Sequence, residues 1–475
     1  MKVTLISPPW ALSEQYGLTL PEVGSIEEPL GLAYIAAVLE KKGHQCRIID
    51  GFGEQMDQNR FREVISSDDS DLYGVSASTP MIKRTTEAVK IINEVKPDTA
   101  VMIGGPHVGA MLKVERHEEL FKAGGRIDYA IYGEGELTVA ELVEKLESGR
   151  PAADIDGTIV NEGGRITVNK PREVIDDLDS IPFPARHLLP KGVYRPSLSR
   201  YRRLPVRSII ISRGCPYKCI YCSNRYVFGP RIRSRKPEYI VDEIQSLVEN
   251  FGVREVRFWD DTFTLNKRLV LELCREIVDR KIDVLWTCFG RLDNVDPEML
   301  EAMKKAGCWQ IDYGVESGND RVLKSIKKGF TTKQALDGFR LTRKHGIFAR
   351  SNFILGLPED TLETIEETID FALACDANIA GFYLPQAYPG TELYDIAIKE
   401  NALTTDDWSK YIVVGDEPSY LNPRIGSIKK LKELQRKAYR RYYMRPKVIV
   451  RAMLGIRSFS DLSRYIRGFF AAIRL

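Results

Sequence analysis

The chain has 475 residues, too many for one ordinary hydrophobic core, so its length predicts two or three domains. With 43% hydrophobic and 28% charged residues, the composition excludes a disordered or fibrous protein. The net charge of +3 is too small to attract nucleic acid through a global field.

Residues 1–149 alternate apolar strands with helical periods, which is typical of a parallel sheet with crossover helices. The first strand comes at once, without the apolar run of a secretory signal, and no later segment supplies the roughly 18 to 20 uncharged residues of a membrane span. We therefore expect a cytoplasmic protein that begins with a doubly wound, Rossmann-like α/β domain. Its strands are expected at residues 3–7, 45–50, 72–76, 100–104 and 129–132.

Residues 150–205 are rich in Pro, Gly and Arg and are predicted to form a linker. A second series of six strand and helix repeats follows in residues 206–399, which predicts a partial (β/α)6 barrel of the TIM type. In such sheets the chemistry gathers at the carboxyl ends of the strands. These strands are expected at residues 208–212, 255–259, 284–288, 310–315, 350–355 and 379–385.

The alternation stops in residues 400–475, which are predicted to form a helical, basic subdomain. Residues 431–475 contain twelve Lys or Arg against two Asp or Glu. One interpretation is a helical unit that packs on the barrel and keeps a solvated basic face. A second is peripheral contact with the inner face of an anionic membrane, through a basic amphipathic helix such as residues 460–474. Nucleic acid is disfavoured because no recognition motif accompanies the charge.

Three cysteines stand close together in ISRGCPYKCIYCSNR, directly after a predicted strand: Cys215, Cys219 and Cys222. In this C-x3-C-x2-C spacing each thiolate can hold one iron of a 4Fe-4S cubane, and the fourth iron keeps no protein ligand. A small chelating cofactor with an amine and a carboxylate can occupy that iron. A structural zinc site would want a fourth Cys or His, and none lies within twenty residues. The other five cysteines are expected to be small buried hydrophobic side chains: Cys46, Cys274, Cys288, Cys308 and Cys375.

The cysteine loop resembles the defining motif of the radical S-adenosylmethionine (SAM) superfamily, and the resemblance covers roughly residues 206–394. It implies that a reduced cluster cleaves SAM to a 5'-deoxyadenosyl radical. It also implies a SAM site at strand ends, in the motifs RFWDDTF, YGVESG and FILGLPED. We expect adenine beside Tyr221 and Gly356, the methionine amino group on Asp260 and Asp261, and the ribose on Glu316 and Ser317.

Two arginines are candidates for the methionine carboxylate: Arg291, in CFGRLD, and Arg350, at the start of the fifth strand. For each, a structural salt bridge is an equally good interpretation. For Asp260 and Asp261 the alternative is helix capping ahead of Asn266.

The N-terminal domain resembles the cobalamin-binding domain that precedes radical SAM domains in a class including cobalamin-dependent methyltransferases and the anaerobic Mg-protoporphyrin monomethyl ester cyclase. The motifs GVSASTP, MIGGPHVGA and YGEGE carry this resemblance. The D-x-H-x-x-G signature is absent, so cobalamin is expected to bind without that axial histidine; an empty domain kept as a scaffold is the alternative. Hydroxyls and bare backbone at strand ends are the expected cobalamin contacts: Ser76, Thr79, Gly104, Gly105, Gly133 and Glu134.

Together these features predict an enzyme that uses a 4Fe-4S cluster, SAM and cobalamin to methylate an unactivated carbon. The alternatives are a cobalamin-dependent radical cyclase or oxidative rearrangement, and a non-catalytic cobalamin or redox sensor. A methylthiotransferase is disfavoured because only Cys46 precedes Cys215, whereas that group carries three further clustered cysteines. The expected partners are a small-molecule or lipid-like substrate and an electron donor such as ferredoxin or flavodoxin, with no nucleic acid.

Overall fold

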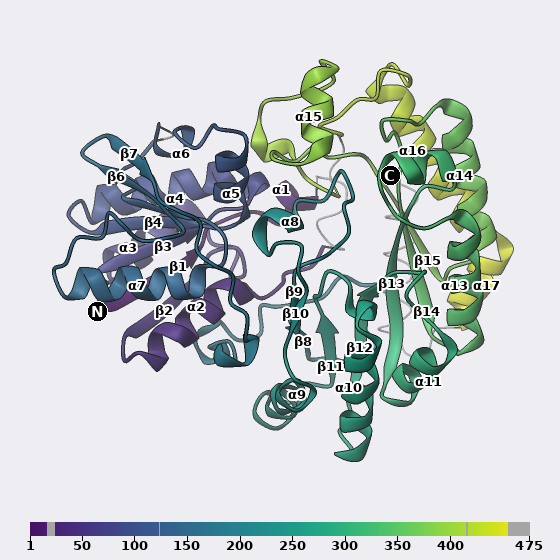
Figure 1. Ribbon diagram of the computed structural model, residues 1–475, viewed down its shortest axis with the longest axis horizontal. Coiled ribbons are helices and arrows are strands. Elements are labelled where there is room, and N and C mark those ends of the chain that lie inside the picture. The colour runs from purple at the N-terminus through teal and green to yellow at the C-terminus, as the bar shows by residue number, and fades with distance from the viewer. Residues whose placement is uncertain (17–23, 123, 415–416, 455–475) are drawn as a thin grey trace.

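The computed structural model describes residues 1–16, 24–122, 124–414 and 417–454. Two β-sheets lie at opposite ends of an elongated molecule, a mainly parallel one built from the N-terminal residues and a parallel one from the middle of the chain (Figure 1). Both sheets occur where the sequence predicts them, so the expected α/β architecture of a Rossmann-like domain followed by a partial barrel is confirmed.

The first sheet has seven strands in the order β2-β1-β3-β4-β5-β6-β7. Helices cover both faces, and a separate hydrophobic cluster fills the space under each layer. The strands are β1 Lys2–Ser7, β2 Gln45–Asp50, β3 Leu72–Ser76, β4 Ala100–Gly104, β5 Tyr129–Ile131, β6 Thr158–Glu162 and β7 Arg165–Val168. The helices are α1 Leu12–Tyr16, α2 Leu30–Lys41, α3 Gln58–Ser66, η1 Thr79–Met81, α4 Ile82–Val95, α5 Pro106–Lys113, α6 Glu119–Lys122 and α7 Gly135–Glu147.

The segment 150–205, predicted as a linker, instead supplies two strands to the first sheet. β6 pairs antiparallel with β5, and β7 pairs antiparallel with β6. Apolar and polar residues alternate less clearly in these two strands, of four and five residues, than in the parallel strands. One reason is that β7 lies at the sheet edge and exposes most of its side chains. After β7 the chain runs through two short 3-10 turns, η2 Leu178–Ser180 and η3 Arg186–Leu188, toward the second sheet.

The second sheet has six parallel strands in the order β15-β14-β13-β12-β11-β8 and forms an incomplete barrel whose edge strands are β15 and β8. The strands are β8 Val206–Ile209, β11 Glu255–Phe258, β12 Leu285–Gly290, β13 Cys308–Glu316, β14 Phe348–Ile354 and β15 Ile379–Tyr383. Helices cover the outer face: α9 Pro237–Phe251, α10 Lys267–Asp279, α11 Pro297–Lys305, α12 Asp320–Ser325, α13 Thr332–Lys344 and α14 Leu362–Cys375. A short ribbon of β9 Ser212–Arg213 and β10 Arg233–Ser234 flanks α8 Asn224–Val227.

Local sequence explains where the barrel helices begin and end. The side chain of Asn266 caps α10 by accepting a hydrogen bond from Leu269 N, and Thr331 forms a capping box with Gln334 at the start of α13. α9 begins with Pro237, and Gly252 follows its last residue as the C-cap. The left-handed backbone of Gly252 (φ 63°) is a conformation that glycine adopts without strain.

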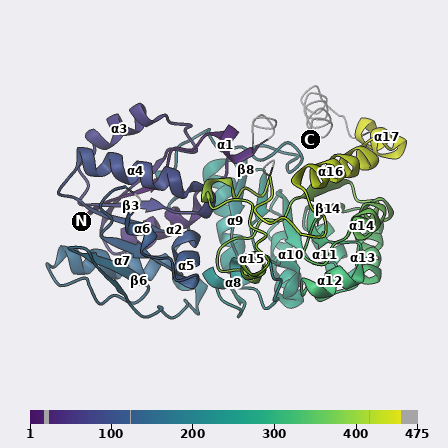
Figure 2. The same ribbon diagram turned by 90° about the horizontal axis from the view of Figure 1, so that it is seen from above.

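Helix α16 (Ile428–Tyr443) closes the edge of the barrel at β15 (Figure 2). The Tyr439 hydroxyl accepts from the backbone N–H of Phe382 and donates to its carbonyl oxygen, and the Tyr443 hydroxyl does the same with Ala380. In a complete sheet, a neighbouring strand would bond to these backbone groups. Part of the basic face of α16 is neutralised by acids of α14, as in the pair of Arg441 with Asp370 at 2.8 Å. The predicted C-terminal helical unit therefore packs on the barrel.

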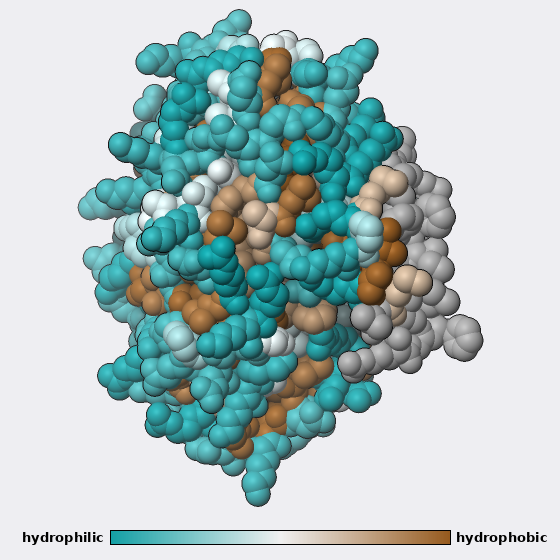
Figure 3. Space-filling view, turned by 90° about the vertical axis from the view of Figure 1, so that its right-hand side faces the viewer, coloured by the Kyte–Doolittle hydropathy of each residue, from teal (hydrophilic) through white to brown (hydrophobic). Residues whose placement is uncertain are grey.

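Other C-terminal elements are α15 Glu392–Lys399, η5 Trp408–Lys410 and α17 Pro446–Leu454. The side of the molecule that carries α14, α16 and α17 is mainly hydrophilic, with separate apolar patches (Figure 3). Residues 460–474, the predicted membrane-binding helix, lie outside the described residues. Among the helices that the structure describes, none has both the length and the apolar character of a membrane span.

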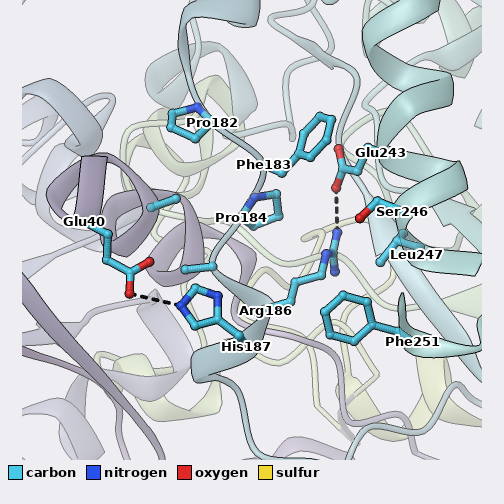
Figure 4. Close-up of a pocket in the computed structure, with 12 residues that line it drawn as sticks. Glu40, Pro182, Phe183, Pro184, Arg186, His187, Glu243, Ser246, Leu247 and Phe251 are labelled. Carbon is cyan, nitrogen blue, oxygen red and sulfur yellow. Dashed lines mark hydrogen bonds and ion pairs between the residues drawn. The ribbon is translucent and has the colours of Figure 1, made fainter. Parts of the chain in front are cut away.

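Buried ion pairs join the two domains. Arg186, on η3, contacts Glu28 at 2.6 Å and Glu243 of α9 at 2.9 Å, and these side chains are all less than 5% exposed. Arg186 and Glu243 line a hollow of about 300 Å³ between α2, the proline-rich segment and α9 (Figure 4). This hollow is remote from the strand ends that carry the sequence motifs, so we assign it a role in domain contact.

Candidate active site

The cysteine loop begins at the end of β9 in a conformation that requires glycine. Gly214 has a φ of 92°, and a Cβ atom at this position would lie 2.2 Å from the carbonyl oxygen of Arg231. Cys215 N donates to Gly229 O at 3.2 Å, and Cys222 N donates to Cys219 O at 3.2 Å. The loop is therefore shaped by its own backbone and by the return segment before β10.

The three loop cysteines are half-buried, free thiols. Burial raises the pKa of Cys215, and it raises the pKa of Cys222 to about 11. Within the described residues, no three His, Cys, Asp or Glu side chains gather closely enough to share one metal ion. A cubane does not require such a gathering, because each thiolate binds a different iron. Three thiols on one loop thus fit a 4Fe-4S cluster better than a mononuclear zinc site.

Glu316 and Tyr221, two predicted SAM contacts, are brought together by Lys328. The ammonium of Lys328 lies 2.8 Å from the Glu316 carboxylate and 3.3 Å from the Tyr221 hydroxyl. Glu316 ends β13 with a φ of 75°, and its carboxylate folds over Gly314, where a Cβ atom would lie 2.4 Å from it. Sequence reasoning missed Lys328, because a lysine in KSIKKG is indistinguishable from a surface residue. Its only signal was its position after the YGVESG strand end.

Asp260 and Asp261 occupy different environments at the end of β11. Asp260 is 2% exposed, and its Oδ1 accepts hydrogen bonds from Ile211 N and from both the backbone and the hydroxyl of Ser212. Its Oδ2 is buried without a partner, and burial raises its pKa to about 7. Burial likewise raises the pKa of Asp261 to about 6; this carboxylate bonds to the amide of Asn224, just beyond the cysteines. Neither aspartate caps α10.

The neighbouring strand ends enclose two other predicted SAM contacts. Ser317 is fully buried, and its hydroxyl bonds to Thr368 and accepts from Asn319 N, so a SAM contact would need this arrangement to change. Gly356 has a φ of 95°, and a Cβ atom there would lie 3.0 Å from the side chain of Leu431 on α16. Both assignments stay predictions.

The two candidate arginines lie at different depths. Arg291 pairs with Asp293 at 3.0 Å and stacks on Tyr217, with its guanidinium carbon 3.5 Å from the ring centre. It therefore contacts the cysteine loop by stacking on Tyr217, while its ion pair with Asp293 is local. Arg350 points into the barrel and bonds to the hydroxyls of Ser199 and Tyr383.

The predicted cobalamin contacts line the carboxyl edge of the first sheet, where β3, β4 and β5 end. Gly105 has a φ of 132°, and a Cβ atom there would lie 2.6 Å from the carbonyl oxygen of Ala77, so a side chain is excluded. Gly133 also has a positive φ, with open space where a Cβ atom would be. This bare backbone suits a broad planar ring. Ser76 and Gly104 end neighbouring strands on the same edge.

Thr79 and Glu134, at the same edge, already have protein partners. The Thr79 hydroxyl lies 3.1 Å from Nδ1 of the buried His107. Glu134 is 7% exposed and pairs with Arg233 at 2.8 Å, while Glu136 pairs with Arg213 at 2.5 Å. Because both arginines flank the cysteine loop, Glu134 links the two domains, and a cobalamin contact would compete with that ion pair.

The stability of the first domain is expected to fall in acid because of His107. Burial lowers its pKa from 6.5 to about 4, so between these pH values only the unfolded chain takes up the proton. The contribution of neutral His107 is complete above pH 6.5 and is lost as the pH falls to 4, by roughly 3 kcal/mol in total. Urea unfolding at several pH values should show a smaller acid loss for His107→Gln, which keeps a hydrogen-bonding group near Thr79. Equal losses in both proteins would contradict the assignment.

The carboxyl edges of the two sheets meet around α8. This helix follows the last cysteine and lies between the domains, and the ammonium of Lys113, on α5, lies 5.7 Å from the centre of the Tyr226 ring (Figure 1). From the C-terminal side, Trp408 packs against His107. The cysteine loop and the glycine-lined edge are therefore adjacent parts of one site.

Comparison with known proteins shows which family the chain belongs to. Residues 209–372 match the model of the radical SAM superfamily, and residues 18–143 match the B12 binding domain. An uncharacterized methyltransferase of Pyrococcus horikoshii is 34% identical over 470 residues, covering 98% of both chains. The chain belongs to the cobalamin-dependent radical SAM family. Because this relative, which matches over nearly the whole chain, is named as a methyltransferase, the protein is an enzyme and the sensor hypothesis is set aside.

Other known proteins also match over most of the chain. The anaerobic magnesium-protoporphyrin IX monomethyl ester cyclase of Rubrivivax gelatinosus is 29% identical over 382 residues, covering 78% of this chain and 67% of that protein. Among solved structures, the methyltransferase TsrM from Kitasatospora setae, with cobalamin and a [4Fe-4S] cluster bound, superimposes with a TM-score of 0.73. It is 20% identical, and the match covers 100% of this chain and 98% of TsrM. The arrangement of domains is thus a known one.

Proposed function

We propose that this protein methylates an unactivated carbon of a small-molecule substrate, using a 4Fe-4S cluster, SAM and cobalamin. The observation that carries the proposal is the meeting of the C-x3-C-x2-C loop and the glycine-lined edge of the first sheet around α8. A reaction that needs both a radical and a methyl donor needs two cofactor sites that face one substrate. The name of the Pyrococcus horikoshii relative, a methyltransferase, supports the same choice.

The chain's own residues supply binding and orientation. Cys215, Cys219 and Cys222 would hold the cluster, and Glu316, held by Lys328, would receive the ribose hydroxyls of SAM. Gly105 would let cobalamin approach the backbone. When bound, these groups supply a carbon radical that removes hydrogen from the substrate and a methyl group that replaces it. The protein's contribution is to hold the partners in line and to exclude water.

A radical cyclase is the second candidate, because three relatives with 26% to 29% identity carry the name of the magnesium-protoporphyrin cyclase. Other relatives are named for methylation of bacteriochlorophyllide d and of a hopanoid. These names support an apolar or tetrapyrrole-like substrate. We further infer a small electron-transfer protein such as ferredoxin or flavodoxin as the reductant, and contact with an anionic membrane through residues 460–474.

The two candidates give different SAM products. Anaerobically purified protein, reconstituted with iron, sulfide and hydroxocobalamin, should be incubated with SAM, a reductant and candidate substrates. Formation of both 5'-deoxyadenosine and S-adenosylhomocysteine, with a substrate mass gain of one methylene, supports methylation. Deoxyadenosine without S-adenosylhomocysteine supports the cyclase. Failure to form deoxyadenosine at all would refute both.

A further inference from the structure

The inner face of the barrel is reached by water. Along β14 the residues alternate: Ala349, Ser351 and Phe353 face the outer helices and are buried, whereas Arg350 and Asn352 face inward and are only half-buried. β14 has a neighbouring strand on each side, so the exposure of its inner residues does not come from a free edge. The inner face is therefore open to water beside β14, whereas Arg257 and Asp312, on other strands of the sheet, are buried.

Three arginines converge on this inner face. Arg257 comes from β11, Arg350 from β14 and Arg200 from the segment before β8. Arg200 pairs with Asp312 of β13 at 3.2 Å. The guanidinium carbons of Arg200 and Arg257 lie 5.7 and 5.6 Å from the centre of the Phe289 ring. Three guanidinium groups thus face two carboxylates, Asp312 and Glu27, which leaves a net positive charge beside an aromatic surface.

Arg257 has bonding capacity that the protein does not use. Its side chain is 3% exposed, and one amino group donates to Glu27 at 2.8 Å, but the other, Nη2, is buried without a hydrogen-bond partner. Burial, together with the charge of Arg200, lowers the pKa of Arg257 to about 10. A buried donor without a partner is costly, so Nη2 needs an acceptor that the protein does not supply, such as an oxygen of a ligand or of water.

Arg350 is similar, because its hydrogen bonds go to neutral groups. Its partners are the hydroxyls of Ser199 at 2.9 Å and Tyr383 at 3.2 Å, and the amide oxygen of Asn352 at 3.4 Å. A planar guanidinium held by hydroxyls keeps its charge available to an oxyanion.

The arginines lie deeper in the barrel than the SAM contacts. Asp312 and Arg350 are paired in register, each four residues before the end of its strand at Glu316 and Ile354. Four residues of a strand span roughly 13 Å. An anion on Arg350 would therefore lie well below Glu316, on the side of the site away from the strand ends.

We propose that Arg257 and Arg350, with Arg200 beside them, bind an oxyanion of the substrate, a carboxylate or a phosphate, inside the barrel. This inference rests on the proposed function, since it places the substrate below the SAM site. The guanidinium groups of Arg257 and Arg350 would donate hydrogen bonds to the oxyanion, and the rings of Phe289 and Trp259 would pack against the adjoining part of the substrate. Among the substrates proposed above, this narrows the class to molecules that carry an organic anion, such as a tetrapyrrole with a carboxylate, and disfavours an uncharged apolar molecule.

The test uses the reconstituted protein and two simple probes, inorganic phosphate and acetate, titrated by calorimetry at constant ionic strength. We expect saturable binding of one of them, weakened at least about tenfold in Arg350→Met and in Arg257→Met. Arg268→Met, which removes an arginine from the exposed side of α10, is the matched control and should bind like the wild type. Tighter binding of phosphate indicates a phosphate-bearing substrate, and tighter binding of acetate a carboxylate.

The SAM affinity and cluster content of each variant are measured in parallel. Unchanged values, with lost anion binding, support the proposal and show that the variants are folded. If either variant loses SAM affinity, the arginines serve the methionine carboxylate and the proposal is overturned. It is also overturned if the wild type binds neither probe, or if all variants bind alike. Failure of the proposed function would appear separately, as absent SAM cleavage in the wild type.

Discussion

Replacement of Cys219 by alanine is expected to abolish the visible absorption of the cluster and to reduce SAM cleavage to background. Only three protein ligands are available to the cubane, and two thiolates cannot anchor it against loss of iron. The Cys219 thiol is half-buried and packs against the carbonyl of Lys327 at 3.9 Å, outside the hydrophobic core, so the fold should survive. Iron and sulfide content, the absorption spectrum and deoxyadenosine formation are the measurements.

Cys46→Ala is the matched control for this prediction. Cys46 is also half-buried and free, but it lies in β2, in the N-terminal domain and outside the cysteine loop. The control should keep the iron content and activity of the wild type, and both variants should keep its circular dichroism. Cluster or SAM cleavage retained in Cys219→Ala would refute the assignment of the loop.

Replacement of Arg186 by methionine is expected to destabilise the protein by about 3–5 kcal/mol, the usual cost of removing one partner from a buried ion pair. Glu28 would keep Arg207, at 2.9 Å, but Glu243 would be left buried and unpaired. The Glu243 Oε2 atom already lacks a hydrogen-bond partner, so within the described residues the bond to Arg186 is the one that its carboxylate makes. Because this arginine joins the domains, we expect their unfolding to separate into two transitions.

Urea unfolding followed by fluorescence and circular dichroism measures this effect. Arg268→Met is again the control: its side chain is 87% exposed, and the loss of its pair with Glu272 should cost less than about 0.5 kcal/mol. The double variant Arg186→Met with Glu243→Leu should recover part of the stability, since it removes the stranded carboxylate. A loss below about 1 kcal/mol in the single variant would show that the pair does not hold the domains.

The sequence was sufficient wherever the information is local. The alternation of apolar residues predicted β2, β3 and β4 with their observed bounds. The C-x3-C-x2-C spacing identified the cluster loop, because three ligands within eight residues need no tertiary structure to be brought together. The motifs at strand ends were also located correctly, because each motif directly follows the strand that its own residues predict. A parallel sheet then places the carboxyl ends of its strands on one edge.

Only the tertiary structure decided which side chains from different strands or domains come into contact. Lys328 becomes the partner of Glu316 and Tyr221, and Glu134 becomes a domain link to Arg233, through contacts that join different strands or domains. The tyrosines of α16 close the β15 edge, and β6 and β7 extend the first sheet, although neither segment shows a clear pattern of its own. The barrel arginines come together from Arg200, Arg257 and Arg350, 150 residues apart at the extremes. No sequence period encodes such encounters, because sheet order and domain packing, rather than spacing along the chain, bring these charges to one place.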